Sequence, residues 1–336
     1  MTTKEIIIVE LAEHFNEEVN GEKLASLCKV SRAAVWKAIN SLRKEGCKIS
    51  GTQNSGYKLT SFCDFYSAPL INYFITKNYP QYKNLNIEFF DKIDSTNLYA
   101  KQYISGTKNN FPALIAACSQ TKGKGRLGRT FISPKNTGIY ISIIYSPEEK
   151  ITECAKITAF AAVAVRRAIK KLFDLNVSIK WINDLYFNEK KVCGILTEGT
   201  TNFETGTIDN AIIGIWINLI ENKALKNEPS KIAGALFEKK CDILFARAKL
   251  TALITGEVLS LLEEINSTNS KNKIIEEYKS LSFLQGKTVE VHPIIDGEKS
   301  YKAKVLDIDE NASLVVETKN GEIKKLISGE VTLHKN

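Results

Sequence analysis

The stretch between residues 113 and 218 constrains the fold most, because short β-branched segments alternate there with a long helical pattern. The short segments are rich in Ile and Val, as strands are, and residues 151–173 have the apolar spacing of one long helix. The pattern predicts a mixed α/β domain built around a β-sheet. The predicted strands are Ala113–Cys118, Gly138–Tyr145, Val177–Ile182, Val192–Glu198 and Ala211–Asn218.

The first 63 residues predict a separate winged helix-turn-helix domain. Two short amphipathic segments within residues 21–44 meet at a tight turn, and Ser31 can cap the second of them. Residues 48–59 then favour two short strands, which would form the wing.

The positive charge of this first domain gathers on its second helix and wing. The whole chain has 46 Lys and Arg against 38 Asp and Glu, a net charge of +8, which favours an anionic partner without naming it. Residues 29–58 contain seven basic side chains and a single acidic one, Glu45. We expect this helix to contact phosphates and base edges in a DNA major groove, the alternative being a solvated face in a module that binds only protein. The candidate DNA-binding residues are Ser31, Arg32, Lys37, Asn40 and Lys44.

Several classes of protein are not expected. The seven cysteines are scattered and form no C-x-x-C pair, which argues against a zinc ribbon and against a disulfide framework. No apolar run approaches the roughly 18 residues that span a bilayer, so we expect a reduced, cytoplasmic protein. The three histidines lie outside glycine-rich or strand-end settings, so Lys, Arg, Asn and Asp are the expected chemical groups.

A basic glycine-rich loop, QTKGKGRLGR at residues 120–129, follows the first predicted strand. Its glycines let the backbone approach a ligand, while Lys124, Arg126 and Arg129 supply positive charge. The loop is neither a Walker loop nor the G-x-G-x-x-G of a Rossmann unit. It predicts a binding site for phosphate or carboxylate, with a solvated turn or a nucleic-acid contact as the alternatives.

Two further segments add polar groups near strand ends. The motif KWINDLY at residues 180–186 places Asn183 and Asp184 directly after a predicted strand, and Asp184 is a candidate Mg²⁺ ligand. Lys191 opens the following strand and would return to the same end of the sheet. Gly194 has no side chain, so a ligand could lie against that strand.

The last segment, from about residue 286, has short strand patterns at 288–292, 301–307, 313–318 and 322–327. The Asn320-Gly321 pair between the last two is a strong hairpin signal. These strands predict a small β-barrel at the end of the chain.

Taken together, the motifs resemble those of the bacterial biotin protein ligases, in particular the bifunctional type known as the biotin operon repressor. The family pattern has S-T-N, Q-x-x-G-R-G-R-x-G-R, K-W-P-N-D, K-x-x-G-I-L, G-I-G-I-N and a late G-E. The N-terminal SRAAVWKAINSLRKEG with the later GYKL is similar to the family's winged helix, which the monofunctional ligases lack. The matching segments here are Ser95-Thr96-Asn97, the loop from Gln120, KWIND from Lys180, Lys191 to Leu196, Gly214 to Leu219 and Gly329-Glu330.

The chain departs from the family pattern at four positions. Lys124 replaces the first arginine of the loop and keeps the charge without the planar fork of a guanidinium. Trp216 stands in place of a glycine, and we expect it to be a core residue beside the ligand-binding strand. The other departures are Leu127 and Ile182, the latter in place of proline.

The resemblance implies an α+β protein with a winged helix-turn-helix at residues 1–63, a catalytic domain at 64–283 and an SH3-like barrel at 284–336. It implies an ATP-dependent ligase that makes biotinyl-5′-AMP with Mg²⁺ and transfers biotin to a lysine of the biotin carboxyl carrier domain of a carboxylase. It also implies a homodimer that represses biotin genes by binding operator DNA, with no membrane partner.

The resemblance also implies roles for single residues. Lys191 and Arg126 would be catalytic, and Asp184 would bind the metal ion. Biotin would be held by Ser95, Thr96, Asn97, Gln120, Lys124, Gly125, Arg126, Lys191 and Gly194, and ATP by Arg126, Arg129, Asn183, Lys191 and Asn218.

Three other interpretations stay open. A lipoate ligase would have a similar catalytic fold and the same adenylation step. A ligand-sensing transcriptional repressor could have weak or lost ligase activity, which the departures at Lys124 and Leu127 allow. A ligase whose N-terminal domain has no operator is the third.

Overall fold

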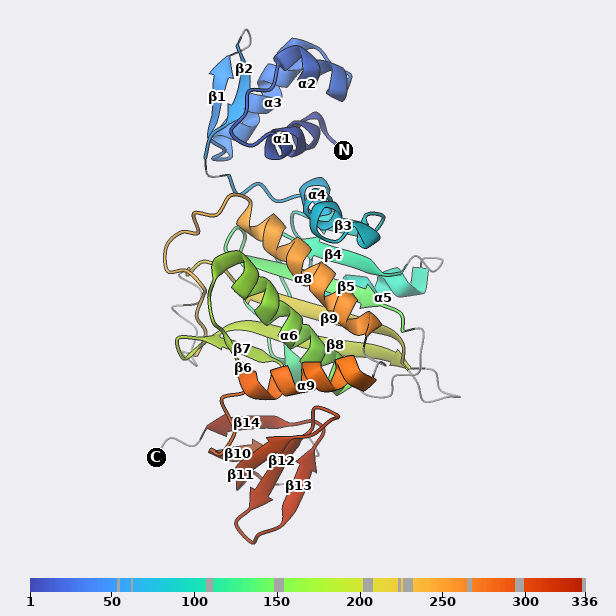
Figure 1. The fold of residues 1–336 in the computed structure, drawn as a ribbon, viewed down its shortest axis with the longest axis vertical. Helices are drawn as coiled ribbons and strands as arrows, with labels where there is room; N and C mark the ends of the chain where they lie inside the picture. Colours follow the sequence, from blue (N-terminus) through green and yellow to red (C-terminus); the bar gives the residue numbers. More distant parts are fainter. Residues whose placement is uncertain are drawn as a thin grey trace. The chain divides into compact units, whose positions relative to one another are not determined.

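The computed structural model describes residues 1–52, 55–61, 63–106, 111–147, 154–201, 208–222, 225, 232–264, 268–293 and 299–333. Contacts within the chain divide it into two compact units, Met1–Phe89 with Lys240–Gly256 and Phe90–Lys239 with Glu257–Asn336. Figure 1 shows the elements of both units in the order of the chain.

The first unit begins with a winged helix-turn-helix, as predicted. Ser31 caps its second amphipathic helix by accepting a hydrogen bond from the backbone N–H of Ala34 at 3.3 Å. The apolar stripe of that helix, Val35, Ile39 and Leu42, is fully buried, which leaves its opposite face to solvent. The elements are α1 Thr3–Glu13, α2 Gly21–Cys28, α3 Arg32–Lys44, β1 Ile49–Thr52 and β2 Gly56–Leu59.

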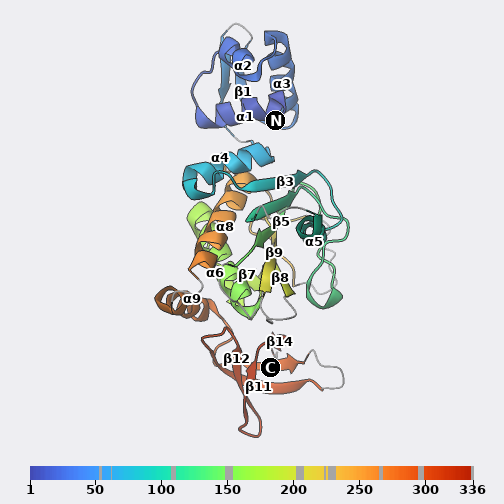
Figure 2. The ribbon, with the colours of Figure 1, turned by 90° about the vertical axis from the view of Figure 1, so that its right-hand side faces the viewer.

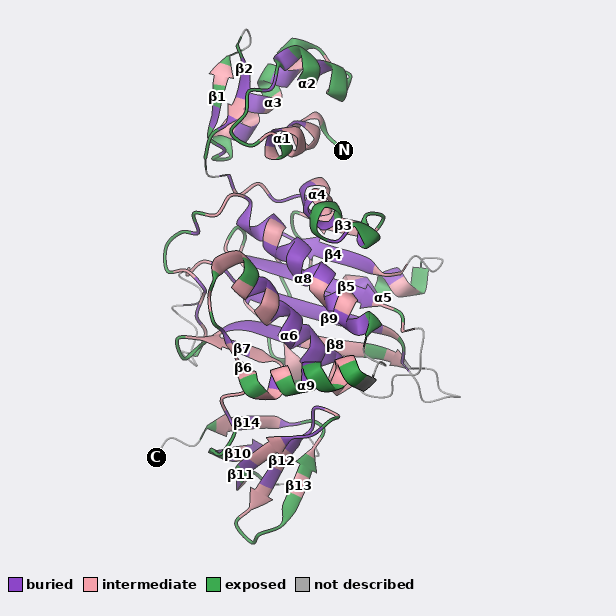
Figure 3. Cartoon of the chain, in the orientation of Figure 1, coloured by how far each residue is buried: buried purple, intermediate pink, exposed green. Residues whose placement is uncertain are grey.

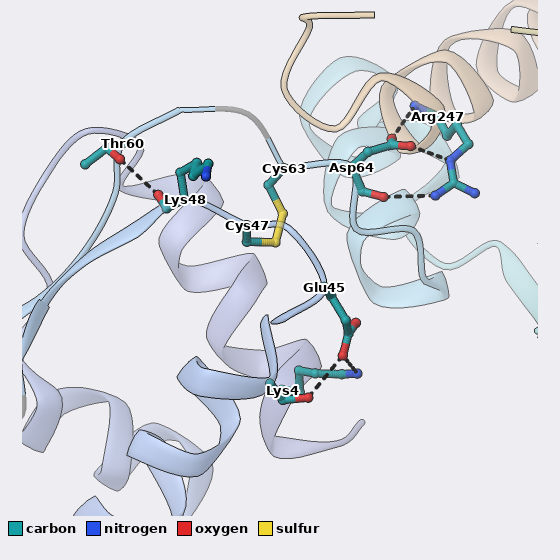
Figure 4. The surroundings of a disulfide bond; sticks show 9 residues. Lys4, Glu45, Cys47, Lys48, Thr60, Cys63, Asp64 and Arg247 are labelled. Atoms are coloured by element: carbon teal, nitrogen blue, oxygen red, sulfur yellow. Dashed lines mark hydrogen bonds and ion pairs between the residues drawn. A yellow bond between two sulfur atoms is a disulfide. The ribbon is translucent and has the colours of Figure 1, made fainter. Parts of the chain in front are cut away.

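A disulfide between Cys47 and Cys63 corrects the expectation that all cysteines are reduced (Figure 4). Cys47 precedes β1 and Cys63 follows β2, so the antiparallel hairpin brings the two thiols together although 16 positions separate them. Thr60 donates a hydrogen bond to the carbonyl of Lys48 at 3.0 Å beside this bridge. An odd cysteine count and the lack of a C-x-x-C motif argue against a framework of several disulfides, but they say nothing about one pair that a hairpin closes.

The rest of the first unit is helical apart from residues 86–89, which are the first four residues of strand β3. It contains α4 Ala68–Asn78, the short helix η1 Pro80–Tyr82 and the first part of α8 Ala246–Glu263. Arg247 of α8 donates to the carboxylate of Asp64 at 2.7 Å, and its side chain is only 5% exposed (Figure 4). This charged hydrogen bond attaches α8 to the segment that follows the disulfide.

The second unit is built on a seven-stranded sheet of order β3-β4-β5-β9-β8-β7-β6. All pairings from β4 to β6 are antiparallel, and β3 contributes its last residue, Phe90, to this unit. The five predicted strands are present, but the predicted strand Val177–Ile182 is shorter and is followed by a separate strand, β7, that the apolar pattern did not reveal. The strands are β3 Asn86–Phe90, β4 Ala113–Ala117, β5 Gly138–Tyr145, β6 Ser178–Lys180, β7 Asp184–Phe187, β8 Lys190–Thr201 and β9 Ile208–Asn218.

Helices cover both faces of this sheet (Figure 2). The long helix α6 Cys154–Phe173 lies on one face and α5 Thr96–Gly106 on the other, while α9 Thr268–Leu281 packs against α6. Residues 151–153, where the predicted helix began, lie outside the described residues. Figure 3 shows buried residues running through α6 and the central strands β5 and β9, which mark the core. In the described part of the chain no helix has both the length and the apolar character needed to cross a membrane.

A five-stranded antiparallel sheet of order β13-β12-β11-β10-β14 closes the second unit. The predicted hairpin at Asn320-Gly321 is present, with Gly321 at φ +79° donating its N–H to Thr318 at 3.0 Å. Among the described residues β13 and β14 are not paired, so the predicted SH3-like barrel is not confirmed. The strands are β10 Thr288–His292, β11 Tyr301–Ile308, β12 Leu314–Thr318, β13 Ile323–Leu326 and β14 Glu330–Leu333, the last of which was not predicted.

Candidate functional site

A cavity of about 630 Å³ lies in the second unit, where β7, β8 and β9 meet the glycine-rich loop and the start of β14. The antiparallel register explains this gathering, because Asp184 pairs with Gly194 and Gly194 with Trp216 across three neighbouring strands. The residues predicted from sequence that line it are Gly125, Arg126, Arg129, Asn183, Asp184, Lys191, Gly194 and Asn218.

The glycine-rich loop is folded back on itself beside the cavity. The N–H of Gly125 donates to the carbonyl of Arg129 at 2.7 Å, and that of Phe131 to Gly123 at 2.9 Å. A Cβ at Gly123 would lie 2.5 Å from the carbonyl oxygen of Phe131, so this close approach requires glycine. Leu127 has a positive φ of 55° within a short helical turn.

Arg126 connects the loop to two other parts of the unit. Its guanidinium donates to Asn183 Oδ1 at 3.0 Å and to the carbonyl of Gly329 at 3.2 Å. Burial lowers the pKa of Arg126, and the nearby carboxylates of Asp184 and Glu330 oppose that shift, so the group remains a cation. The loop, the turn before β7 and the C-terminal sheet are therefore held at the cavity by one charged side chain.

Arg129 and Glu330 form a bidentate ion pair at the same edge, with N–O distances of 2.8 and 2.6 Å. The hydrogen bond to Glu330 raises the pKa of Arg129. Burial disfavours the charged form of Glu330, but the hydrogen bond from Arg129 and the neighbouring cations lower its pKa overall. The family's late G-E motif singled out Glu330 but did not indicate a partner for it. In the structure that partner is Arg129.

Lys191 Nζ lies 2.7 Å from Asp184 Oδ1 at the cavity wall. Lys180, opposite Asp184 in the β6–β7 pair, also lines the cavity, and burial lowers the pKa of Lys180. Sequence reasoning did not select Lys180, although it is the first residue of the KWIND motif. Four cations, Lys180, Lys191, Arg126 and Arg129, thus face two carboxylates, Asp184 and Glu330, and the excess positive charge suits a phosphate-bearing ligand.

A second group of predicted residues is buried apart from the cavity lining. This polar cluster consists of Ser95, Thr96, Asn97 and Gln120, each less than 9% exposed. Gln120 Oε1 accepts hydrogen bonds from the backbone N–H and the hydroxyl of Thr96 at 2.8 and 3.2 Å. Asn97 Nδ2 donates to Glu198 at 2.8 Å and its Oδ1 accepts from Ser142 at 2.6 Å. Thr96 and Gln120 are thus bonded to each other and Asn97 to residues outside the polar cluster, and none of the cluster's members lines the cavity.

Two remaining predictions have different surroundings. Asn218 lines the cavity, and its amide donates to the carbonyl of Gly234 at 2.9 Å, which orients its oxygen. Lys124 is exposed and does not line the cavity.

The donor set fits a magnesium ion only together with phosphate groups. Asp184 is a single carboxylate whose Oδ1 already pairs with Lys191, and Asn183 Oδ1 accepts from Arg126. Mg²⁺ is usually bound by one or two carboxylates with substrate phosphates completing its six oxygen ligands. Among the described residues, the group of three clustered potential metal ligands is Glu10 and Glu13 of α1 with His14 directly after it, and none of them belongs to these strands.

In the first unit, α3 presents a basic groove of about 490 Å³. It contains the predicted DNA-binding residues Lys37, Asn40 and Lys44, whereas Ser31 and Arg32 lie outside its lining. Sequence reasoning missed Trp36, a residue that lines the groove and is 46% exposed. Arg43 also lines the groove and donates to the carbonyl of Gly51 at 2.8 Å, which ties α3 to the wing.

Two family models match this chain. A model described as the Biotin/lipoate A/B protein ligase family matches residues 89–218, and one described as an HTH domain matches residues 4–58. The first match contains most of the cavity-lining strands, and the second contains the whole helix-turn-helix and most of the wing.

Relatives of similar length carry names that combine a ligase with a repressor. The chain is 27% identical to the "Bifunctional ligase/repressor BirA" of Bacillus subtilis over 99% of both chains. It is also 27% identical to the protein of that name from Escherichia coli, over 94% of this chain and 92% of the relative. A biotin protein ligase from Aquifex aeolicus, solved in complex with biotin and ATP, superimposes with a TM-score of 0.58 and 25% identity, covering 75% of this chain and 99% of that one.

Proposed function

The chain belongs to the bifunctional biotin protein ligases, in which a ligase domain follows a helix-turn-helix domain, and we propose that it joins biotin to protein with ATP and represses transcription. The observation that carries the enzymatic half is the cation-rich cavity around Lys191 and Arg126. A site that brings a carboxylate up to a phosphate needs this surplus of positive charge, because the two reactants repel each other.

In the first step the carboxylate oxygen of biotin attacks the α-phosphorus of ATP, forming biotinyl-5′-AMP and releasing pyrophosphate. Lys191 and Arg126 steady the carboxylate and the α-phosphate, and Arg129 steadies the departing pyrophosphate. We add Lys180 to this set, because it lines the same cavity beside Asp184. The gain comes from alignment and charge, with no nucleophilic side chain involved.

In the second step the amine of an acceptor lysine attacks the acyl carbon, and AMP leaves with the electrons of the broken anhydride bond. The acceptor is the biotin carboxyl carrier domain of a carboxylase. The glycine-rich loop, held by Arg126 to Asn183, screens the mixed anhydride from water until that lysine arrives.

Magnesium bound with ATP neutralises phosphate charge, and Asp184 with Asn183 would hold it. Biotin would contact the polar cluster, together with Gly125, Gly194 and Lys124. The nucleoside would lie near Asn218, which lines the cavity.

The repressor half rests on the basic groove of α3. Lys37 and Lys44 contact DNA phosphates and Asn40 reads a base edge in the major groove. Two winged helices of a homodimer would bind two half-sites of an operator. The domain boundaries would lie near residues 63 and 283. The protein would act in the cytoplasm.

The decisive experiment measures pyrophosphate release from ATP and Mg²⁺ with biotin, with lipoate and octanoate as parallel substrates. Release with biotin alone establishes the ligase. Pyrophosphate release only with lipoate would assign the chain to the lipoate ligases. No release with any of the three acids would favour the ligand-sensing repressor.

Repression is tested separately by gel-shift binding to the DNA upstream of the organism's biotin genes, with and without biotin and ATP. A shift that strengthens with both ligands supports the bifunctional protein. No shift under any condition would identify a ligase whose N-terminal domain lacks an operator.

A further inference from the structure

Trp216 occupies an unusual position in the second unit. It lies on β9 between Gly214 and Asn218, so the three residues share one face of the strand. The residue is only 1% exposed, and its ring stacks on Phe131 with centroids 5.9 Å apart and planes inclined by 28°. Both aromatic residues line the cavity that holds Lys191 and Arg126.

The far edge of the same indole reaches the polar cluster. A Cβ placed on Gly214 would lie 2.8 Å from Trp216 Cη2 and in direct collision with Asn97 Oδ1. Gly214 therefore lacks a side chain because the indole and Asn97 already fill the space above it. Trp216 therefore reaches both regions, because it lines the cavity and also approaches Asn97 of the polar cluster over Gly214.

The indole N–H of Trp216 is buried and has no hydrogen-bond partner among the described residues. Trp181 offers the comparison, since it lines the same cavity and its indole N–H donates to the carbonyl of Ala312 at 2.8 Å. A buried donor left unpaired costs free energy, and a bound ligand with an oxygen acceptor recovers it. The unpaired N–H therefore indicates that the indole of Trp216 gains a hydrogen bond when a ligand binds in the cavity.

We propose that Trp216 is a gate that controls entry of the biotin head group into the polar cluster. The inference rests on the proposed function, because biotin is the ligand that passes the gate. In the structure the indole lies over Gly214 beside Asn97, on the passage that biotin would take to the polar cluster. When biotin enters, the indole turns toward the cavity and donates its N–H to an oxygen of the bound acid or its adenylate. Trp216 is thus a specificity-determining residue, since an acid without a bulky head group requires less displacement.

The test compares the KM values for biotin and for ATP in the parent and in Trp216→Gly. If about one molecule in ten has the passage open, removing the indole lowers the biotin KM about tenfold and leaves the ATP KM within about twofold. A biotin KM that stays the same or rises in Trp216→Gly overturns the gate, because the block that the indole places on entry would then cost no more than the hydrogen bond that its N–H gives to the ligand.

Two controls separate the gate from damage to the strand. Ile215→Val changes the adjacent buried residue, which points to the opposite face of β9, and it should leave the ratio of the two KM values at the parent value. If Trp216→Gly does not fold, Trp216→Leu keeps a large apolar side chain and should still lower the biotin KM. An unchanged or raised value in that folded variant overturns the proposal equally.

Biotin binding measured by calorimetry without ATP distinguishes failure of the gate from failure of the function. Tighter binding by Trp216→Gly than by the parent supports the gate, even when the parent releases no pyrophosphate. If the parent releases pyrophosphate with biotin and the variant binds biotin no better, only the gate is wrong. If neither protein binds biotin, the proposed function and the gate are both wrong.

Discussion

The ammonium of Lys191 lies 2.7 Å from the carboxylate of Asp184, and this ion pair joins two neighbouring strands at the cavity wall. A register shift between Leu185 and Tyr186 in the β7–β8 pair brings the two side chains to the same place. Such irregularities re-aim side chains next to functional sites. Asp184 therefore holds the lysine in position before substrate arrives, so that little reorganisation is required during the reaction.

Lys191→Ala is expected to lower pyrophosphate release at saturating biotin and ATP by about a hundredfold or more, because it removes a fixed charge from the reacting anions. The matched control is Lys190→Ala, the adjacent exposed lysine, which is not part of the cavity lining. Near-normal release by Lys191→Ala at saturation would remove this residue from the reaction.

Arg126→Gly is expected to form the adenylate but to release it early, because the loop loses its bonds to Asn183 and Gly329. A filtration assay should show adenylate leaving the protein, and unrelated lysines nearby should become labelled. Lys122→Ala, an exposed residue of the same loop that pairs with Asp94, is the control. Retention equal to the parent's would show that Arg126 does not close the site.

Glu330→Gln is expected to lower stability at neutral pH but not in acid. Because the pKa of Glu330 is lowered in the folded protein, its ion pair with Arg129 stabilises the fold above the ordinary glutamate pKa. That contribution is lost as pH falls through the lowered value. Arg129 is 66% exposed, so the effect is roughly 1 kcal/mol or less. Tm measured against pH should show the gap between parent and variant closing below about pH 4. A gap that persists at lower pH would contradict the ion-pair explanation.

The disulfide predicts a thiol count. Five of the seven cysteines should react with a thiol reagent in the denatured, unreduced protein, and all seven after reduction. Cys63→Ser should lower the stability of the first unit by about 3 kcal/mol, since the bridge closes a loop of 16 residues. Cys241→Ser, a change at a buried free cysteine of the same unit, is the control. Seven reactive thiols without reduction would contradict the bridge.

Lys37→Ala is expected to weaken DNA binding by the same factor for every sequence. It should also reduce the slope of log affinity against log salt concentration by about one, because one phosphate contact is lost. Asn40→Ala should instead relax preference at one base pair. Lys23→Ala, in α2 and paired with Glu10 at 2.7 Å, is the control for charge alone. Equal losses of DNA affinity in Lys23→Ala and Lys37→Ala would indicate a diffuse electrostatic attraction and no specific contact from Lys37.

Local patterns in the sequence determined most of the architecture. The stripe Val35, Ile39 and Leu42 with the Ser31 cap defines α3, and the Ile- and Val-rich runs define β4, β5, β8 and β9, because periodicity and capping act over a few residues. The Asn320-Gly321 turn is local in the same sense. The short strands β7 and β14 were missed because each has only four residues, over which an alternation of polar and apolar residues is a weak signal.

The candidate site was predictable as a set of motifs but not as a geometry. Sequence could place Arg126, Lys191 and the polar cluster among the functional residues through the family resemblance. Tertiary structure alone decided that Arg129 meets Glu330 across 201 positions, that Cys47 reaches Cys63, and that the indole of Trp216 approaches Asn97 over Gly214. These contacts depend on strand register and on which side chains share a face of the folded sheet. Residues far apart in the chain carry no local signal of such proximity, so the sequence determined the elements and the folded chain decided what meets at the site.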